Sequence, residues 1–494
     1  MRNTIQFIFN GEPRQLTDVD SNLTVLRYIR ESEHTTGSKE GCAEGDCGAC
    51  TAVVVELNGD RLRYKAVNTC IQFVGMLDGK ALMTVENLKT GSTMHSVQKA
   101  MVEEHGSQCG FCTPGFVMSM FAGAQNGVPP ERAAVNEMLA GNLCRCTGYT
   151  PIINAATKLL QQELSELASE REQHIAAQLK ALQSAEGLHF EHDGKRFIAP
   201  VTVEDLAQTL LTFPDATILA GGTDVGLFVT KKHQTLETLV HLEKVDELRR
   251  IEVSADGIRF GAAVTYQQAR ETLAKLYPSI GELIGRIGAV QVRNLGTIGG
   301  NIANGSPIGD MPPALIAAGA TLSLRRGDAV RTMPLEDFFI AYGKQDRAAG
   351  EFVESVLVPA PAAATVLKVY KISKRIDQDI SSVCGAFNLS FADYSSGPVV
   401  SDARICFGGM DGTPVRALRC EEFLVGRLWN QKTVEQAADL LSTSFQPLND
   451  ARASAEYRNR IAGNLLRKYF LETGTVRLPE SAEALNVGVV YRQN

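Results

Sequence analysis

Residues 40–50 read Glu-Gly-Cys-Ala-Glu-Gly-Asp-Cys-Gly-Ala-Cys, a short loop that holds three cysteines. A fourth cysteine follows after nineteen further residues, so the spacing of the set is C-x4-C-x2-C-x19-C. Its members are Cys42, Cys47, Cys50 and Cys70. Three thiolates can wrap one metal centre only if the backbone is flexible, and Gly41, Gly45 and Gly48 supply that freedom. The loop therefore predicts a metal-binding site near the N-terminus.

The spacing of this first set is typical of the ligands of a plant-type [2Fe–2S] cluster. The alternative is a structural zinc site, which prefers two separated C-x2–4-C pairs. The long first gap and the three closely spaced cysteines fit iron better than zinc. We also expect the glycine-rich backbone to bring amide N–H groups to the sulfurs, where they help to set the reduction potential.

A second set of four cysteines consists of two close pairs, spaced C-x2-C and C-x-C, with 31 residues between the pairs. Its members are Cys109, Cys112, Cys144 and Cys146. The pairs lie beside expected helix starts or turns at Thr113-Pro114 and Thr147-Gly148. A helix N-terminus favours the negative charge of a thiolate group. The spacing alone does not distinguish zinc from iron at this second set.

Composition and charge exclude several classes of protein. The 494 residues are 44% hydrophobic and 21% charged, which suits roughly three or four globular domains. A net charge of −7 without a long basic block argues against nucleic-acid binding. The best candidate for a spanning helix, 311–324, is shorter than the roughly 20 residues that such a helix needs and contains two prolines. The N-terminus lacks the apolar core of a signal peptide. We therefore expect a cytoplasmic protein without a nucleic-acid or membrane partner.

The cysteines are distributed unevenly, with eight of the 11 in the first 146 residues. In a reducing compartment such clustered cysteines bind metal more often than they form disulfides. The three later cysteines, Cys384, Cys406 and Cys420, lie in apolar surroundings, and we expect them to be buried, inert thiols. No histidine pattern points to a metal or a nucleophile, so no catalytic residue is expected in this chain.

Hydrophobic periodicity predicts a β-rich unit followed by helices. Alternation over residues 5–9 and a hairpin of strands at 51–57 and 61–67 indicate the first unit. Helix starts at Thr113-Pro114, Pro129-Pro130-Glu131 and Thr150-Pro151 predict a small helical bundle. Residues 163–185 are charged, rich in alanine and free of glycine and proline, and they fit a linker and a surface helix of the bundle equally well. Two amphipathic helices are expected near the C-terminus, over 433–441 and 453–470, and in the second Tyr457, Ile461 and Leu465 recur at helical spacing.

Two glycine-rich runs lie in the middle of the chain, at 220–224 after a short apolar strand and at 294–301. Backbone N–H groups in such a run can form a concave site for a phosphate. Neither run is a G-x-G-x-x-G motif that opens a helix, so a Rossmann dinucleotide fold is not supported. Considered as residues alone, both runs are equally well explained as ordinary tight turns.

The residues that flank the cysteines resemble the signatures of the molybdenum hydroxylases. Residues 108–115 (Gln-Cys-Gly-Phe-Cys-Thr-Pro-Gly) and 141–149 (Gly-Asn-Leu-Cys-Arg-Cys-Thr-Gly-Tyr) are similar to the second-cluster signature of that family. Residues 40–50 resemble its ferredoxin-like signature. Because two independent motifs occur in the family's order, the resemblance implies that both sets of cysteines hold [2Fe–2S] clusters.

The resemblance covers nearly the whole chain and implies an α+β multidomain fold. The implied parts are a β-grasp, plant-type ferredoxin-like [2Fe–2S] domain (1–85), a helical-bundle [2Fe–2S] domain (86–162), a linker (163–186), a vanillyl-alcohol-oxidase-like FAD-binding domain (187–365) and an α+β flavoprotein C-terminal domain (366–494).

The resemblance also implies which residues contact FAD. Residues 218–225 would line its pyrophosphate, residues 297–301 would clasp the phosphates and ribitol, and Asp310 would bond the adenosine side with Val353 and Lys371 nearby. The implied residues are Ile218, Leu219, Ala220, Gly221, Gly222, Thr223, Asp224, Val225, Ile287, Thr297, Ile298, Gly299, Gly300, Asn301, Asp310, Val353 and Lys371. Ile287 departs from the family pattern, because the animal enzymes carry an aromatic residue at that position.

Two further segments, 338–342 and 374–379, resemble segments beside the flavin where NAD⁺ docks. The alternative for the charged segment 374–379 is a solvated turn.

The order of the domains resembles the small iron–sulfur/FAD subunit of bacterial xanthine dehydrogenases within this family. It implies a molybdopterin-binding large subunit as partner, in a heterotetramer of two small and two large chains. The implied electron path runs from molybdenum on the partner through the second cluster, then the first, to FAD and NAD⁺ while hypoxanthine and xanthine are oxidised to urate. An aldehyde oxidase or another aza-heterocycle hydroxylase would share this arrangement. An alternative from a different functional class is a non-redox scaffold protein that is held together by structural zinc and binds no flavin.

Overall fold

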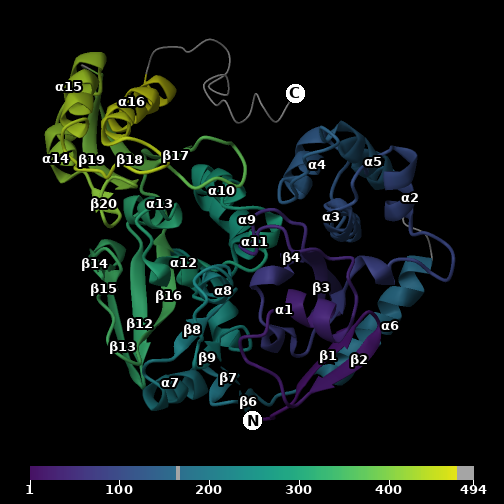
Figure 1. The fold of residues 1–494 in the computed structure, drawn as a ribbon. Coiled ribbons are helices and arrows are strands. Elements are labelled where there is room, and N and C mark those ends of the chain that lie inside the picture. The colour runs from purple at the N-terminus through teal and green to yellow at the C-terminus, as the bar shows by residue number, and fades with distance from the viewer. Residues whose placement is uncertain (163–166, 396, 475–494) are drawn as a thin grey trace. The chain divides into compact units, whose positions relative to one another are not determined.

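The computed structural model describes residues 1–162, 167–395 and 397–474, and its chain forms two compact units. The first unit contains residues 1–246 together with 288–296, and the second contains 247–287 and the described residues from 297 onward. Figure 1 gives the order of the elements along the chain by colour. None of the helices in the described ranges has the length and apolar character that crossing a membrane requires.

The first unit begins with a five-stranded sheet in the order β2-β1-β5-β3-β4. Only the β1–β5 pair is parallel, and alternate residues of β1 face the core, as the sequence pattern predicts. The strands are β1 (Ile5–Phe9), β2 (Glu12–Leu16), β3 (Thr51–Asn58), β4 (Arg61–Asn68) and β5 (Ala81–Met83). The short helical turns are α1 (Val25–Arg27), η1 (Tyr28–Ser32), η2 (Thr69–Ile71), η3 (Val74–Leu77) and η4 (Val85–Asn87). This sheet with its helical turns is the expected ferredoxin-like domain.

The helical bundle of the first unit follows. Its helices are α2 (Ser96–Glu103), α3 (Thr113–Gln125), α4 (Arg132–Leu139) and α5 (Thr150–Leu160). The segment of α3 carries no charged side chain, and its residues from Gly115 to Ala124 are buried, as expected for a helix that is apolar on all sides. The sequence pattern places Val102 on the buried face of α2 with Val97 and Met101. That prediction is wrong, because Val102 is 59% exposed while the other two are buried.

Helix α6 (Leu167–Leu182) accounts for most of the expected linker, whose residues 163–166 lie outside the described ranges. It lies along β1, β3 and β4, and Figure 1 shows it beside β1. Ile175 and Leu179 enter the hydrophobic core, and the Nε2 of Gln178 donates to the carbonyl of Gly11 at 2.8 Å. The segment is therefore a helix that packs on the ferredoxin-like sheet.

A four-stranded sheet completes the first unit, in the order β6-β7-β9-β8, with β9 parallel to both β7 and β8. Its strands are β6 (Leu188–His192), β7 (Lys195–Ala199), β8 (Thr217–Leu219) and β9 (Thr238–His241), and its helices are α7 (Val203–Thr212), α8 (Val225–Thr230) and α11 (Val290–Arg293). Phe197 and Leu239 of this sheet share one hydrophobic core with Phe7 and Phe73 of the ferredoxin-like domain.

The second unit contains an antiparallel five-stranded sheet in the order β10-β11-β16-β12-β13. Its strands are β10 (Ile251–Ser254), β11 (Gly257–Gly261), β12 (Thr321–Arg326), β13 (Ala329–Pro334) and β16 (Phe352–Pro359). The associated helices and the small hairpin are α9 (Tyr266–Leu276), α10 (Pro278–Gly285), α12 (Ile298–Asn304), α13 (Met311–Ala317), η6 (Leu335–Phe338), β14 (Phe339–Ala341) and β15 (Lys344–Gln345), and η5 (Asp246–Arg249) leads into the unit.

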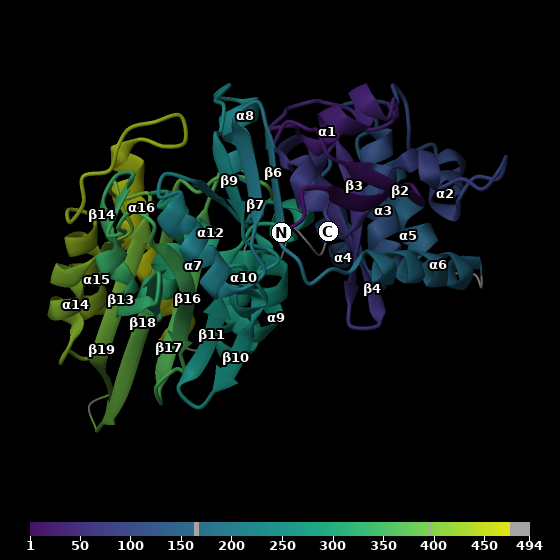
Figure 2. The ribbon, with the colours of Figure 1, turned by 90° about the horizontal axis from the view of Figure 1, so that it is seen from below.

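The last part of the second unit is a four-stranded antiparallel sheet with helices on it, as Figure 2 shows. Its elements are β17 (Thr365–Ile372), β18 (Val383–Tyr394), β19 (Gly397–Gly408), β20 (Val415–Arg416), α14 (Leu418–Leu424), α15 (Gln431–Leu441) and α16 (Ala455–Thr473). Both predicted C-terminal helices are present, but Tyr457, which the pattern places on the apolar face of the second, is exposed. The neighbouring Arg458 is buried instead, bonded to the carbonyl of Gly409 at 2.8 Å.

Candidate functional site

Three cysteines of the first set lie in the loop between η1 and β3, and Cys70 lies in η2, directly after β4. The loop turns through left-handed backbone at Ala43, Gly45 and Gly48. The Cys42 thiol contacts those of Cys47 and Cys70, and Cys70 in turn contacts Cys50. Contact with Cys47 and Cys70 lowers the pKa of Cys42.

Backbone amides approach the sulfur of this set, as the sequence predicts. The amides of Glu44 and Cys47 donate to the Sγ of Cys42 at 3.4 and 3.3 Å. Cys50 and Cys70 are buried, each with 2% of its surface exposed. The first set is therefore a largely buried site with amide donors that favour negative charge on sulfur.

The second cysteine set lies around the start of α3 and in the turn before α5. Its thiols meet as two pairs, Cys109 with Cys146 and Cys112 with Cys144. Burial, followed by contact with Cys144, raises the pKa of Cys112 to about 12. Cys109 and Cys146 are exposed, in contrast to the inner members of the first set.

Tyr149 orders the turn that carries the last two cysteines. Its backbone has a positive φ of 69°, and its hydroxyl accepts a hydrogen bond from the amide of Cys144 at 3.0 Å. Apolar side chains that lie close to the cysteines of this set in the sequence are also exposed. They are Phe111, Leu143 and Tyr149, of which Phe111 is the most exposed at 46%. The second set therefore faces solvent within an apolar rim.

Both sets fit a two-iron cluster by their chemistry. A [2Fe–2S] cluster is held by four Cys thiolates, two to each iron. Each set supplies four thiols that contact one another, in a chain of contacts in the first set and as two pairs in the second. Over residues 1–162, 167–395 and 397–474, no group of three or more His, Cys, Asp or Glu side chains is placed to hold a single metal ion.

The two cysteine loops are in direct contact. The amide of Leu143, next to Cys144, donates to the carbonyl of Cys47 at 3.0 Å. A Cβ on Gly48 would collide with the carbonyl oxygen of Gly141, and one on Gly115 would collide with that of Gly48. The sequence explains Gly48 only by loop flexibility, whereas the structure also requires glycine there for the close approach of the second loop.

The first glycine run forms the turn between β8 and α8 in the first unit. The amides of Gly221, Gly222 and Thr223 have no hydrogen-bond acceptor among the described residues. Gly222 has a φ of +74°, and a Cβ on Gly221 would collide with the carbonyl of Leu295. Free amide donors on a tight turn suit a phosphate group. This run therefore fits the expectation that residues 218–225 hold a pyrophosphate.

The same run packs directly on the first cysteine set. A Cβ on Gly222 would lie 3.1 Å from the carbonyl oxygen of Ile71, and one on Gly226 would collide with the backbone of Ile71. Ile71 follows Cys70 in the chain. The turn that offers free amides and the segment that carries a cluster ligand are therefore neighbours within one unit.

Residues 297–301 of the second glycine run, which belong to the second unit, differ from the sequence-based interpretation of a row of free amides. Thr297 caps α12, and its Oγ1 accepts from the amide of Gly300 at 3.0 Å. The amides of three further residues also have acceptors: Ile298 on Val264, Gly299 on Ala262 and Asn301 on Thr297. The group left available is the Oδ1 of Asn301, which is buried without a hydrogen-bond partner.

Asp310 and Lys371 lie together in the second unit, as the resemblance implies. The Nζ of Lys371 is 2.6 Å from the Oδ2 of Asp310, and the hydroxyl of Ser381 donates to its Oδ1 at 2.5 Å. Both carboxylate oxygens are thus bonded to protein. Ser381 carries no motif that the sequence could have revealed. Val353 is buried on β16, and Ile287 packs partly buried against the core of this unit.

The remaining sequence-based expectations concern exposed segments and the late cysteines. Phe338 and Phe339 belong to the core, but Tyr342 in the turn between β14 and β15 is 75% exposed. Segment 374–379 is a partly exposed loop, bridged by a hydrogen bond of 2.8 Å from the Arg375 amide to Asp379. The three late cysteines are fully buried, as expected, and burial raises their pKa values.

Four family models match the chain in sequence order. They are the 2Fe-2S iron–sulfur cluster binding domain over residues 7–74, the [2Fe-2S] binding domain over 84–157, the FAD binding domain in molybdopterin dehydrogenase over 189–361, and the CO dehydrogenase flavoprotein C-terminal domain over 368–473. These matches confirm the expected fold class, with two iron–sulfur domains ahead of a flavin-binding domain.

Relatives and solved structures agree with the family models. Xanthine dehydrogenase 1 of Arabidopsis thaliana is 30% identical over an alignment that covers 94% of this chain and 39% of that protein. A carbon monoxide dehydrogenase from Hydrogenophaga pseudoflava is 28% identical with a TM-score of 0.52, covering 55% of this chain and 94% of that one. Quinoline 2-oxidoreductase from Pseudomonas putida 86 is 29% identical with a TM-score of 0.51, covering 56% and 94%. The chain thus spans about two fifths of the curated relative.

Proposed function

Because the chain belongs to the molybdenum hydroxylase family, we propose that it is the iron–sulfur/FAD subunit of a xanthine dehydrogenase. In this proposal it carries electrons from a molybdenum site on a partner chain to NAD⁺ during oxidation of hypoxanthine and xanthine to urate. The observation that carries the proposal is a continuous series of contacts within the first unit. It leads from the exposed second cysteine set, through the buried first set, to the free amides of Gly221–Thr223.

When bound, the clusters supply one-electron transfer and the flavin links it to the two-electron chemistry of NAD⁺. Cys109, Cys112, Cys144 and Cys146 would hold one cluster, and Cys42, Cys47, Cys50 and Cys70 the other. The amides on Cys42 Sγ stabilise charge on sulfur, and burial of Cys50 and Cys70 excludes water from that side of the first set. The chain's residues thus position and tune cofactors.

The first glycine run would bind a phosphate of FAD. Its three free amides on a turn are the donors that a pyrophosphate requires. In the second unit, the unpartnered Oδ1 of Asn301 offers an acceptor to a ligand hydroxyl or amide. The FAD contacts of Thr297, Asp310, Val353 and Lys371, the NAD⁺ segments and the domain boundaries at 85, 162, 186 and 365 remain parts of the proposal.

The exposed second set would face the molybdopterin-binding large subunit, in a complex with two copies of each chain. Its apolar rim of Phe111, Leu143 and Tyr149 is the kind of surface that a protein partner covers. Exposure of Cys109 and Cys146 leaves this set accessible to a redox centre on that partner.

The oxidised substrate is a separate part of the proposal. The match over 94% of the chain to a protein named xanthine dehydrogenase supports a purine. The structural match to quinoline 2-oxidoreductase supports the alternative of an aza-heterocycle or aldehyde hydroxylase with the same cofactor arrangement.

One set of measurements on the purified complex tests these statements. We expect an absorbing, brown-red protein with about four iron atoms and one FAD per copy of this chain, bleached by xanthine without oxygen and reoxidised by NAD⁺. A colourless protein that contains zinc and no iron would contradict the redox function. Bleaching by quinoline or an aldehyde, but not by xanthine, would contradict the purine assignment alone.

A further inference from the structure

Gln291 occupies an unusual place in the first unit. It lies on the short helix α11 and is fully buried. Its Nε2 is 3.1 Å from Asn142 Oδ1, 3.2 Å from Ser119 Oγ, 3.3 Å from Thr51 Oγ1 and 3.4 Å from the carbonyl oxygen of Gly141. The amide nitrogen of a glutamine has two hydrogens to donate. Four acceptor atoms therefore lie within hydrogen-bond distance of a group that can donate only two hydrogens.

Each of the four acceptors belongs to a segment that carries cluster ligands. Thr51 follows Cys50 directly, and Ser119 lies on α3, the helix that begins after Cys112. Gly141 and Asn142 lie just before Cys144. One side chain therefore contacts the ligand-bearing segments of both cysteine sets at once.

The acceptors are also bonded to one another around Gly48. The hydroxyl of Ser119 donates to Asn142 Oδ1 at 2.6 Å, and the side-chain Nδ2 of Asn142 donates to the carbonyl of Gly48 at 3.1 Å. The hydroxyl of Thr51 donates to the same carbonyl at 2.7 Å. Buried networks of this kind hold one geometry, because an unsatisfied buried polar group costs free energy. Gly48 lies between Cys47 and Cys50, so this geometry fixes the first loop against the second.

The helix that carries Gln291 is itself anchored on both iron–sulfur domains. The buried guanidinium of Arg293 is 3.0 Å from Glu137 on α4. The side-chain Nδ2 of Asn294 donates to the carbonyl of Ala66 on β4 at 2.9 Å. Leu295, next in the chain, provides the carbonyl against which Gly221 packs. The same short segment therefore supports both the network and the first glycine run.

We propose that Gln291 is a positioning residue that fixes the separation and relative orientation of the two iron–sulfur clusters through Asn142 and Gly48. This inference rests on the proposed function, because it assumes that both cysteine sets hold clusters. Gln291 does not itself bind a cofactor, and in this proposal it affects the coupling between two cofactors.

Gln291→Met in the full complex tests the proposal, because methionine keeps the length of the side chain and removes its hydrogen-bonding groups. We expect both cluster signals and the iron content to be retained. The magnetic interaction between the two reduced clusters, seen as splitting in low-temperature electron paramagnetic resonance, should diminish, and electron transfer between them should slow severalfold. Unchanged splitting and unchanged rate in this variant would overturn the proposal.

Asn294→Leu is the matched control, because it removes another buried contact of the same segment without touching the network. It should leave the splitting as in the wild type, and an equal loss of splitting would assign the effect to docking of the segment instead. If Gln291→Met does not assemble, Ser119→Ala decides, since it removes only one hydroxyl of the network and should reduce the splitting to a smaller extent. A wild-type complex without two cluster signals would contradict the proposed function itself, whereas two signals that ignore these substitutions would contradict this inference alone.

Discussion

The two cysteine sets differ more in their surroundings than in their number of thiols. Cys50 and Cys70 of the first set are buried in a core that also contains Phe73 and Phe197, whereas Cys109 and Cys146 of the second set are exposed. The first set is thus built into the packing of the first unit, and the second lies on its surface. The first set therefore depends on the fold around it, whereas the second set remains accessible to a partner.

Loss of a ligand should have the largest effect, and it should differ between the sets. Cys70→Ser places a hydroxyl in the shared core and removes the first cluster, so we expect a loss of more than about 3 kcal/mol in unfolding free energy. Cys146→Ser removes an exposed ligand and should cost about 1 kcal/mol. Thermal unfolding of both variants beside the wild type measures the difference, and equal losses would contradict the contrast.

Glycine substitutions should show the same contrast on a smaller scale. In Gly48→Ala the new Cβ collides with the backbone of Gly141, at a φ of +70°, and we expect destabilisation by about 3 kcal/mol. Gly110 has a similar φ of +82° but no atom within 4 Å of its added Cβ. Gly110→Ala is therefore the matched control and should cost only about 1 kcal/mol from backbone strain. Denaturant unfolding of both variants checks this, and a similar cost for the two would show that the contact between the loops contributes little.

A buried histidine in the first unit should make the free energy of unfolding of that unit fall at acidic pH. The ring of His241 on β9 lies 5.7 Å from that of Phe197, and its Nε2 is 3.6 Å from a carboxylate oxygen of Glu243. Burial lowers the pKa of His241 to about 4. The unfolded chain protonates this histidine below about pH 6.5. Unfolding therefore takes up a proton, and up to about 3 kcal/mol of stability is lost as the pH falls from 6.5 toward 4.

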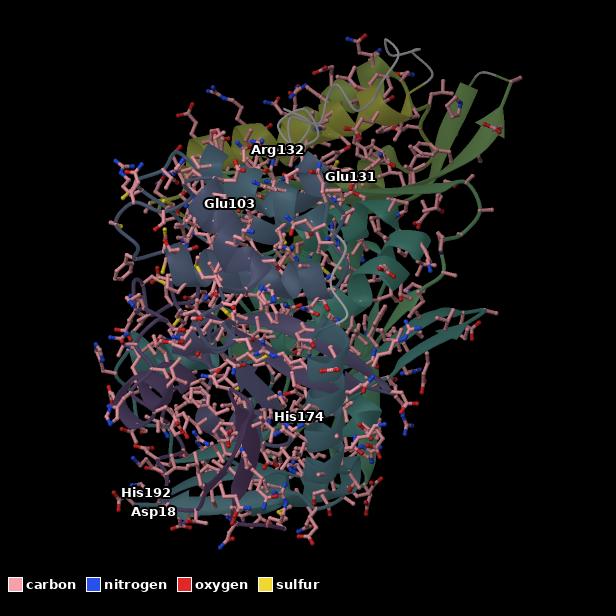
Figure 3. All side chains as sticks on the ribbon, turned by 90° about the vertical axis from the view of Figure 1, so that its right-hand side faces the viewer. Asp18, Glu103, Glu131, Arg132, His174 and His192 are labelled. Atoms are coloured by element: carbon pink, nitrogen blue, oxygen red, sulfur yellow. The ribbon has the colours of Figure 1, made fainter. Side chains whose placement is uncertain are left out.

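His241→Gln should remove that part of the acid sensitivity in thermal unfolding scans between pH 7 and 4.5. His192 is the contrasting case, because it lies beside Asp18 at the edge of the first unit in Figure 3. The hydrogen bond with Asp18 raises the pKa of His192, so its small contribution is present at low pH and is lost as the pH rises through that pKa. His192→Gln should not reduce the loss of stability at low pH, and a loss that persists in full in His241→Gln would contradict the assignment.

The smallest expected effect is a change in the reduction potential of the first set alone. The Nζ of Lys231 is 2.7 Å from the carbonyl oxygen of Cys42 and 3.3 Å from a carboxylate oxygen of Glu44. A positive charge there stabilises the reduced, more negative cluster, so Lys231→Gln should lower its midpoint potential by tens of millivolts.

The neighbouring Lys232 provides the control for this measurement. It lies over the ring of Phe228 at 4.3 Å, so Lys232→Gln should shift the potential of the first cluster less. Redox titration followed by electron paramagnetic resonance separates the two clusters. A shift of the second cluster as large as that of the first would contradict the local origin of the effect.

Local patterns in the sequence predicted the features that depend on local chemistry. The spacing of Cys42, Cys47 and Cys50 identified the first set, and the run at 220–224 predicted the amide-rich turn. Helical periodicity failed at Val102 and Tyr457, because it does not show how wide the buried face of a helix is. The second glycine run differed because Thr297 caps a helix that uses the amides of the run.

Contacts between distant segments could not be predicted from the sequence. Gln291 meets Thr51 and Asn142 only after the chain has folded, and neither spacing nor composition marks that meeting. The same holds for Ser381 at Asp310 and for Lys231 at the first cysteine loop. The family resemblance was also needed for the second set, because its C-x-C spacing is ambiguous between zinc and iron.

We propose that the two cysteine sets hold two distinct [2Fe–2S] clusters in one electron path. Low-temperature electron paramagnetic resonance of the reduced complex, compared between the wild type and Cys112→Ser, is the test. We expect two distinguishable cluster signals in the wild type and the loss of one of them, with the other retained, in the variant. Retention of both signals in Cys112→Ser, or the absence of a second signal from the wild type, would contradict it.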